Sequence, residues 1–241
     1  MIPIRDDNPQ INRPYGVYAL IVVNVVAWLL LQGAGQAEQL YASICQFGLV
    51  PADLSSTDFI GAGQEAICPA NSSLGWAGTV SSMFMHGGWM HIIGNMWFLW
   101  IFGDNVEDAM GTPRFLVFYV LCGLAAAAAQ TFSNLESIIP MVGASGAIGG
   151  VMGAYIVLYP KVKVHLLFIL LILFFRFRVP AILMLGYWAL IQIVGGFTSI
   201  DSTEGGTAFW AHLGGFVAGA LLVLLFKDDD MLKSHPYYGW N

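Results

Sequence analysis

The hydrophobic positions of this 241-residue chain gather into long apolar segments separated by short polar stretches. A helix that crosses a bilayer needs about 20 predominantly apolar residues. Six segments meet or nearly meet that length, and we expect spans at residues 15–32, 84–103, 115–131, 144–160, 180–197 and 208–226. The pattern therefore predicts an all-α polytopic membrane protein in which residues 15–226 form one six-span domain.

The remaining parts of the chain are too polar or too short to span. Residues 1–14 and 227–241 form polar terminal segments, and residues 33–83 form a long loop after the first span. Residues 164–175 are twelve apolar residues bounded by Lys161, Lys163, Arg176 and Arg178, which is too short for a crossing. We expect residues 162–179 to lie in the membrane interface or to form a re-entrant segment, and their role stays open.

Charge supports this topology. The chain is 57% hydrophobic and only 10% charged, whereas soluble domains carry about 25% charged residues. Lys and Arg concentrate in cytoplasmic loops of membrane proteins. Six spans with both termini cytoplasmic place every basic residue on that side, with the loop 33–83 outside.

We expect a multi-pass protein of the cell membrane without a cleavable signal peptide, and no basic patch suggests nucleic acid as a partner.

The fourth predicted span begins with an unusual glycine-rich stretch, residues 143–153, which contains Ser145. Glycine is costly inside a helix, but small residues at spacing four allow membrane helices to approach closely. Backbone amides at the start of a helix are unpaired and carry partial positive charge. Ser145 is therefore either a nucleophile beside amides that can hold an oxyanion, or simply a helix cap.

Four polar residues lie at one predicted depth, about 5–12 Å below the outer surface at 1.5 Å rise per residue. They are His91, Asn95, Ser145 and His212. His212 can act as the base for Ser145, and Asn95 and His91 can donate to an oxyanion. No intramembrane Asp or Glu is available to orient His212, which predicts a dyad. Metal binding by His86, His91 and His212 is an alternative that fits less well, and Asn95 or His212 alone could be packing residues.

Three motifs carry a family resemblance: residues 86–95 (HGGWMHIIGN), residues 143–146 (GASG) and residues 211–219 (AHLGGFVAG). Together they resemble the rhomboid family of intramembrane serine proteases over all six spans. The resemblance implies that Ser145 is the nucleophile, that His212 is the general base, and that His91, Asn95 and the Ser145 amide stabilise the oxyanion. It also implies that the small residues Gly215 and Gly219 pack against the fourth helix.

Two positions depart from the family pattern. Trp76 is followed by Ala77, where many members have a Trp-Arg pair in the first loop. Gly149 stands where some members have an aromatic residue that stacks on the histidine, so another aromatic would have to hold His212. Neither departure removes a side chain to which the resemblance gives a catalytic role.

The resemblance implies a protease that cleaves transmembrane helices of other proteins in the bilayer, without metal or other cofactor. Substrate would enter sideways past the fifth helix and the loop after it, and we expect Phe197, Gly205 and Gly206 to belong to this gate. Two alternatives are a non-catalytic rhomboid-like protein that binds membrane clients, and a channel or transporter, for which internal repeats are lacking.

The three cysteines divide by location. Cys45 and Cys68 lie in the predicted outer loop, whereas Cys122 lies in the third span. Outer compartments oxidise paired thiols, so we expect a bridge between Cys45 and Cys68. Two unpaired thiols are the alternative.

Overall fold

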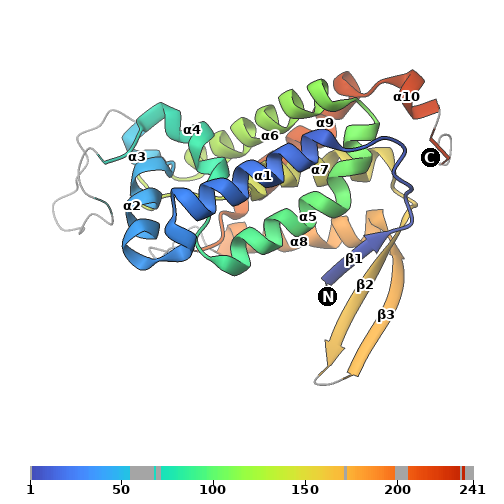
Figure 1. Cartoon of the computed structure of the whole chain (residues 1–241), viewed down its shortest axis with the longest axis horizontal. Helices are drawn as coiled ribbons and strands as arrows, with labels where there is room; N and C mark the ends of the chain where they lie inside the picture. The colour runs from blue at the N-terminus through green and yellow to red at the C-terminus, as the bar shows by residue number, and fades with distance from the viewer. Residues whose placement is uncertain are drawn as a thin grey trace.

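The computed structural model describes residues 2–54, 68, 72–170, 173–198, 206–233 and 235–236. Six helices run side by side along the long axis of the molecule, and they are α1 (Tyr15–Leu30), α5 (Trp89–Asp108), α6 (Thr112–Ser133), α7 (Ser145–Leu158), α8 (Ala181–Thr198) and α9 (Phe209–Phe226) (Figure 1). Short helices gather at the two ends of this bundle, and they are α2 (Ala37–Phe47), α3 (Pro51–Leu54), α4 (Gly78–Ser81) and α10 (Asp229–Lys233). Single 3-10 turns occupy Gly33–Gly35, Gly75–Ala77 and Ser82–Phe84.

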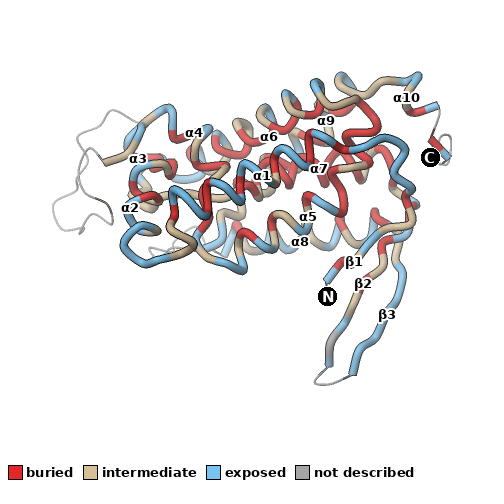
Figure 2. The backbone as a smooth tube through the Cα atoms, viewed as in Figure 1, coloured by how far each residue is buried: buried red, intermediate tan, exposed pale blue. Residues whose placement is uncertain are grey.

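Helix α7 lies at the centre of the bundle. Every residue from Gly146 to Tyr155 is buried, and the helix packs against α5, α6, α8 and α9 (Figure 2). A helix that is apolar on all sides must be covered on all sides, and the sequence of α7 has this character. Helices α5, α6, α8 and α9 keep exposed apolar faces, because each covers α7 with only one side, and α1 packs on α5 and α6.

The contact between α7 and α9 is made by glycine on both helices. A Cβ added at Gly215 would lie 1.9 Å from the carbonyl oxygen of Gly146, and one added at Gly219 would lie 1.9 Å from that of Gly150. In the opposite direction, from α7 toward α9, a Cβ added at Gly153 would lie 2.0 Å from the carbonyl oxygen of Phe216. The two backbones therefore touch directly, as the spacing of small residues predicts.

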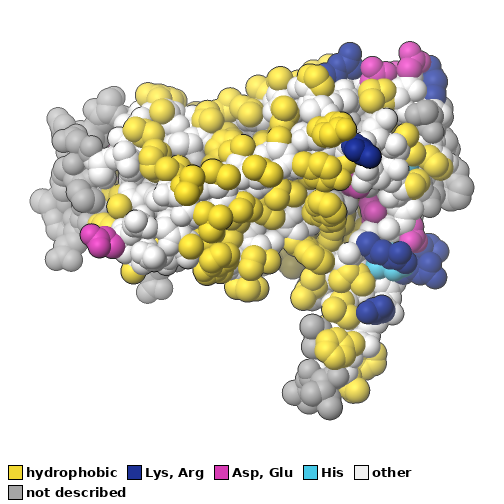
Figure 3. All heavy atoms as spheres, in the orientation of Figure 1, with side chains coloured by type: hydrophobic (Ala, Val, Ile, Leu, Met, Phe, Trp, Pro, Cys, Tyr) yellow, Lys and Arg dark blue, Asp and Glu magenta, His cyan; other side chains and the backbone are white. Residues whose placement is uncertain are grey.

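Helices occupy all six segments predicted to span, with one shift. Helix α5 begins at Trp89 and ends at Asp108, five residues later than expected at each end. Three helices, α6, α8 and α9, are long and apolar enough to cross a membrane, and α1 and α7 are shorter apolar helices. Hydrophobic side chains cover the flank of the bundle, whereas Lys and Arg gather at the end that carries α10 and the strands (Figure 3).

The prediction of an all-α fold is wrong in one region. Strands β1 (Ile2–Asp6), β2 (Lys163–Leu170) and β3 (Leu173–Pro180) form an antiparallel sheet in the order β1-β2-β3. Polar and apolar residues alternate around His165 and Arg176, which is the strand period of two rather than the helix period of 3.6. Strands β2 and β3 therefore pair as a β-hairpin within the predicted interfacial or re-entrant segment 162–179, and they project to the side of the bundle (Figure 1).

The sheet is tied to the helices at its base. Asp6 accepts a hydrogen bond from the hydroxyl of Tyr155, and burial raises the pKa of Asp6 to about 6. The indole N–H of Trp97 donates to the carbonyl oxygen of Pro3 at 2.6 Å. The N–H of Ala181 donates to the carbonyl oxygen of Val162 at 2.7 Å, so the hairpin leads straight into α8.

The last turn of α5 anchors the start of the chain. The carboxylate of Glu107, which is 3% exposed, accepts from the amides of Gly16 and Val17 at 2.8 and 2.9 Å. A buried anion at the start of α1 satisfies unpaired amides and complements the helix dipole. Asp108 accepts from the amides of Ile11 and Asn12 in the same way. Hydrogen bonds from these backbone N–H groups thus offset the free-energy cost of burying the two carboxylates.

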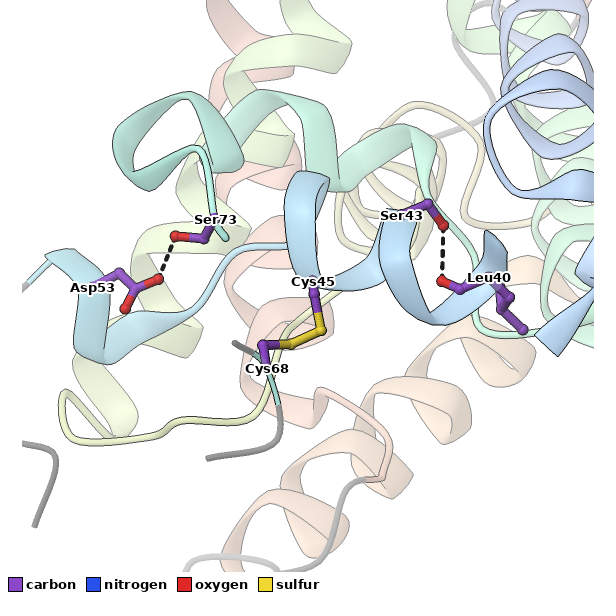
Figure 4. The surroundings of a disulfide bond; sticks show 6 residues. All are labelled: Leu40, Ser43, Cys45, Asp53, Cys68 and Ser73. Carbon is purple, nitrogen blue, oxygen red and sulfur yellow. Dashed lines mark hydrogen bonds between the residues drawn. A yellow bond between two sulfur atoms is a disulfide. The ribbon is translucent and has the colours of Figure 1, made fainter. Parts of the chain in front are cut away.

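The expected disulfide is present. Cys45 in α2 is bonded to Cys68, and their Cα atoms are 5.4 Å apart (Figure 4). Beside the bridge, the hydroxyl of Ser73 donates to the carboxylate of Asp53, which ties α3 to the chain that follows Cys68. Cys122 is a free, buried cysteine in α6.

A matched pair of glycine substitutions tests the α7–α9 contact. Gly215→Ala should lower the thermal midpoint in detergent, by an amount equivalent to about 3 kcal/mol, because the new Cβ overlaps a backbone oxygen that cannot move aside. Gly186→Ala, in α8, meets nothing within 4 Å and should leave the midpoint unchanged or raise it, since alanine favours a helix by about 1 kcal/mol. Equal midpoints for the two variants would contradict the contact.

Thiol counting tests the disulfide. Denatured, unreduced protein should show one reactive thiol, Cys122, and reduction should expose the other two. Closing a loop of 23 residues contributes about 3 kcal/mol in the chain-entropy model, so reduction should also lower the thermal midpoint. Three reactive thiols without reductant would show that the bridge does not form in the membrane-inserted protein.

Candidate active site

Ser145 is the first residue of α7, and a strained turn places it there. Gly143, just before it, has φ of 133°, which side-chain-bearing residues rarely adopt, and its N–H donates to the carbonyl oxygen of Ser82 at 2.9 Å. The first amides of α7, including that of Ser145, have no acceptor within the helix. The hydroxyl and these donors therefore face the same space.

His212 reaches Ser145 from α9. The Nε2 atom of His212 lies 2.7 Å from the Oγ atom of Ser145, which is hydrogen-bond distance. The close approach of the two helices makes this contact possible: a Cβ at Gly149 would lie 2.8 Å from the carbonyl oxygen of His212. The two residues that the sequence pairs across 67 positions are thus neighbours in space.

Gln192 lies behind His212, and the sequence analysis did not assign it. The Nδ1 atom of His212 is 2.8 Å from the amide oxygen of Gln192, while the amide nitrogen of Gln192 donates to the carbonyl oxygen of Trp188 at 3.0 Å. An amide oxygen can only accept, so the Nδ1 atom carries the hydrogen and the Nε2 lone pair faces Ser145. A search for Asp or Glu misses a neutral amide in this position.

An aromatic residue of α8 holds the imidazole in place of a residue at position 149. The ring of Trp188 lies 5.8 Å from that of His212, at an interplanar angle of 35°, and also contacts Phe216. Backbone of α9 fills the space beside Gly149, so an aromatic side chain could not fit there. Trp188 is one turn before Gln192, so a single helix supplies both contacts to His212.

Asn95 and His91 offer hydrogen-bond donors to the same space. The amide nitrogen of Asn95, a residue 7% exposed, is buried and has no partner among the described residues. The Nδ1 atom of His91 accepts from the N–H of Gly87 at 3.2 Å, so its Nε2 atom carries the hydrogen. A Cβ at Gly143 would lie within 2.8 Å of His91 Nε2 and 3.4 Å of the Ser145 Oγ atom. The His91 ring therefore borders the serine.

These side chains line one cavity of about 840 Å³. Its walls include the residues that the sequence grouped by depth together with two from α8 and the loop before α9, namely His91, Asn95, Ser145, Trp188, Gly206 and His212. The cavity is large enough for a short peptide segment, since small-molecule sites are about 300–1,000 Å³.

The predicted gate residues are placed differently from one another. Gly206 lines the cavity, and Gly205 lies outside the described residues. Phe197 is 63% exposed near the end of α8, and its ring meets that of Trp210 edge-on at 5.4 Å. Phe197 thus lies at the seam between α8 and α9 rather than in the cavity wall.

The three histidines of the metal alternative are not arranged as one ligand set. His86 is fully buried, and its ring packs edge-on against that of His91 at 5.1 Å. Its backbone exchanges two hydrogen bonds of 2.8 Å with the side chain of Gln32. His212 faces Ser145 and Gln192 instead, and across the described ranges no three His, Cys, Asp or Glu residues are grouped as metal ligands.

Comparison with known proteins identifies the class. The Rhomboid domain model matches residues 74–228, which include every site residue named above. The chain belongs to the rhomboid family, and it is a membrane protein.

Its relatives include proteins from fungi, plants and bacteria. Rhomboid protein 1, mitochondrial, of Saccharomyces cerevisiae is 30% identical over 148 residues, which are 59% of this chain and 39% of the relative. RHOMBOID-like protein 5 of Arabidopsis thaliana is 27% identical over 67% of this chain and 45% of its own length. Rhomboid protease GluP of Bacillus subtilis is 37% identical over 33% of this chain and 15% of its own length. The chain thus spans less than half of these relatives.

Proposed function

We propose that this protein is an intramembrane serine protease that hydrolyses peptide bonds in or near transmembrane helices of other membrane proteins. The observation that carries the proposal is the chain of contacts from the Ser145 Oγ atom through His212 to Gln192, at the edge of a cavity among apolar helices. A helix cap would need no histidine at its hydroxyl, and a packing histidine would need no serine at its Nε2 atom.

The chemistry follows from the proton positions. His212 takes the proton of Ser145 through its Nε2 lone pair as the Oγ atom attacks the peptide carbonyl, and the resulting imidazolium then protonates the departing amine. The amide of Ser145 and the side chains of Asn95 and His91 donate to the oxygen that gains negative charge. A water molecule, activated by His212, hydrolyses the acyl-enzyme and restores the serine.

We place the chain across the membrane with six spans and both termini on the cytoplasmic side, so that the cavity opens toward the extracytoplasmic side. The gathering of Lys and Arg at the end with α10 supports this orientation, because basic residues stay on the cytoplasmic side. In this scheme residues 1–14 and 227–241 are cytoplasmic and residues 15–226 form the protease domain. The cell membrane is the proposed location, and transmembrane proteins are the proposed partners, without metal or nucleic acid.

Helix α8 is the proposed lateral gate. Ten of its 18 residues are exposed, against four of the 18 residues of α9, so α8 is the least enclosed of the helices that line the site. Phe197 and Gly206 lie at its outer end, where a substrate helix would enter from the lipid. Movement of α8 would also draw Gln192 and Trp188 away from His212.

Removing the proposed nucleophile or base tests the function directly. Ser145→Ala and His212→Ala should each lower cleavage of a model transmembrane substrate by about 10⁴-fold or more, because such residues act as a unit. The thermal midpoint of Ser145→Ala should stay at the parental value, and a fluorophosphonate probe should label the parent but not this variant. Undiminished cleavage by Ser145→Ala would refute the assignment, and client binding without cleavage by the parent would indicate the non-catalytic alternative.

Asn95→Ala tests oxyanion stabilisation. Loss of one donor should lower kcat by about 100- to 1000-fold while KM changes little, since the contact forms only as charge develops. Steady-state kinetics on the same model substrate measures both constants. A parental kcat would assign Asn95 to helix packing instead.

Gln192 variants test the orientation of His212. Gln192→Leu should lower kcat by about 10- to 100-fold at unchanged KM, because the Nδ1–H group loses its buried acceptor. Gln192→Glu keeps an acceptor oxygen and should retain clearly more activity than Gln192→Leu. Thr198→Val is the control on the same helix, since the Thr198 hydroxyl bonds only to carbonyl groups of α8, at 3.1 Å. Parental kcat in Gln192→Leu would show that the contact does not act in catalysis.

A further inference from the structure

The hairpin of β2 and β3 has two chemically different faces. Residues directly opposite in an antiparallel pair point to the same side of the sheet. One side carries only apolar residues, in the opposite pairs Val164/Val179, Leu166/Phe177, Phe168/Phe175 and Leu170/Leu173. The other side carries every Lys and Arg of the two strands, namely Lys163, Arg176 and Arg178, with His165 opposite Arg178. Its outer part is apolar, with Leu167 opposite Arg176 and Phe174 beyond that pair. Arg5 of β1 lies opposite His165 and extends this basic side.

The apolar side is covered only near its base. Val164 and Leu166 are 0% and 5% exposed, because they belong to the core of the bundle. Farther out, Phe168, Leu170 and Leu173 are 40%, 50% and 55% exposed. Figure 2 shows the same change from buried to exposed along the hairpin. An apolar surface of this kind requires an apolar partner.

This surface continues into the lipid-facing side of α8. Strand β3 ends at Pro180 and α8 begins at Ala181, and the first exposed residues of α8 are Ile182 and Leu183, at 50% and 63%. Hydrophobic side chains on the visible flank also run from the helices onto the hairpin (Figure 3). The partner of the hairpin is therefore the one that already surrounds α8, which is lipid.

The basic side adds a preference among lipids. Asp7 accepts from His165 at 2.6 Å and lies 3.8 Å from Arg178, whose side chain stays 59% exposed. Two carboxylates, Asp7 and the Tyr155-bonded Asp6, accompany four Lys and Arg residues, so the sheet keeps a positive excess. Basic side chains beside an apolar surface attract anionic headgroups, with a gain of about fivefold in binding per residue.

We propose that the three-stranded sheet is a docking element for the cytoplasmic leaflet, with its apolar side, including Leu170 and Leu173, among the acyl chains and its basic side against anionic phospholipid headgroups. The inference rests on the proposed placement across the bilayer and is independent of the proposed catalysis. Since β3 leads directly into α8, this docking fixes the cytoplasmic end of α8 and leaves its outer end, with Gln192, as the part that moves.

A single fluorescent label tests the proposal. Cys45 and Cys68 are bonded and Cys122 is buried, so an introduced cysteine is the only reactive thiol of the folded, described chain. Leu173→Cys, labelled with an NBD group in the Ser145→Ala background, is reconstituted in phosphatidylcholine nanodiscs with or without phosphatidylglycerol. Emission typical of hydrocarbon and quenching by chain-labelled doxyl lipid are expected, with deeper insertion when phosphatidylglycerol is present. The same label at Trp76→Cys, 73% exposed beyond the bundle, should not respond to phosphatidylglycerol.

Charge variants complete the test. Arg176→Gln with Arg178→Gln should reduce the effect of phosphatidylglycerol about 25-fold, and Arg176→Gln alone, which keeps the contact of Arg178 with Asp7, should reduce it about fivefold. Arg114→Gln removes the same charge at the start of α6, away from the sheet, and should leave the effect intact. Water-like emission in both lipids would overturn the proposal, as would insertion that ignores lipid charge. Self-quenching that rises with protein density would assign the surface to a second copy instead.

Discussion

Direct contact between the backbones of α7 and α9 is the constraint on which the rest of the structure depends. Ser145 and His212 lie on different helices, and a hydrogen bond of 2.7 Å between them requires those helices to touch. Glycine at positions 146, 150, 215 and 219 removes the side chains that would keep them apart. Lipid supplies no hydrophobic force between helices, so close packing and small residues must hold the pair together. The conformational cost of so many glycines in two helices is thus a condition for the proposed chemistry.

Helix α8 links the proposed base to the proposed gate. Trp188 and Gln192, one turn apart near the middle of α8, supply both contacts that hold the far side of His212. The same helix is exposed along most of its length, and Ala181 and Leu185 enter the core at the end that follows β3. Outward motion of α8 would therefore open the cavity and release the imidazole together. Under the proposed function, the base would be held in its active tautomer only when the helix has returned.

The sheet supports the first turn of α8, which directly follows β3, from outside the bundle. Hydrogen bonds tie β1 to β2 and to α7, and an ion pair joins Asp7, just after β1, to Arg178 of β3. Strand β3 then passes into α8 without an intervening loop. Because one side of the hairpin is apolar and the other basic, its natural environment is the boundary between acyl chains and headgroups.

The sequence by itself determined the membrane class and the six helical segments, because both depend on local periodicity and charge. The Cys45–Cys68 disulfide and the grouping of His91, Asn95, Ser145 and His212 were predictions from the sequence, with unpaired thiols and packing residues as the alternatives. Tertiary structure decided what depends on contacts between distant residues. Gln192 contacts His212 only because the fold brings α8 beside α9. In the same way, the absence of an aromatic side chain at Gly149 is explained only by Trp188, which contacts the imidazole from α8. The strands were also missed. The alternation of polar and apolar residues is confined to the two ends of the segment, around His165 and Arg176, whereas the run of residues 166–175 is apolar throughout and fits a strand or a helix equally well. Pairing with β1, over 150 residues earlier in the chain, is invisible to local pattern.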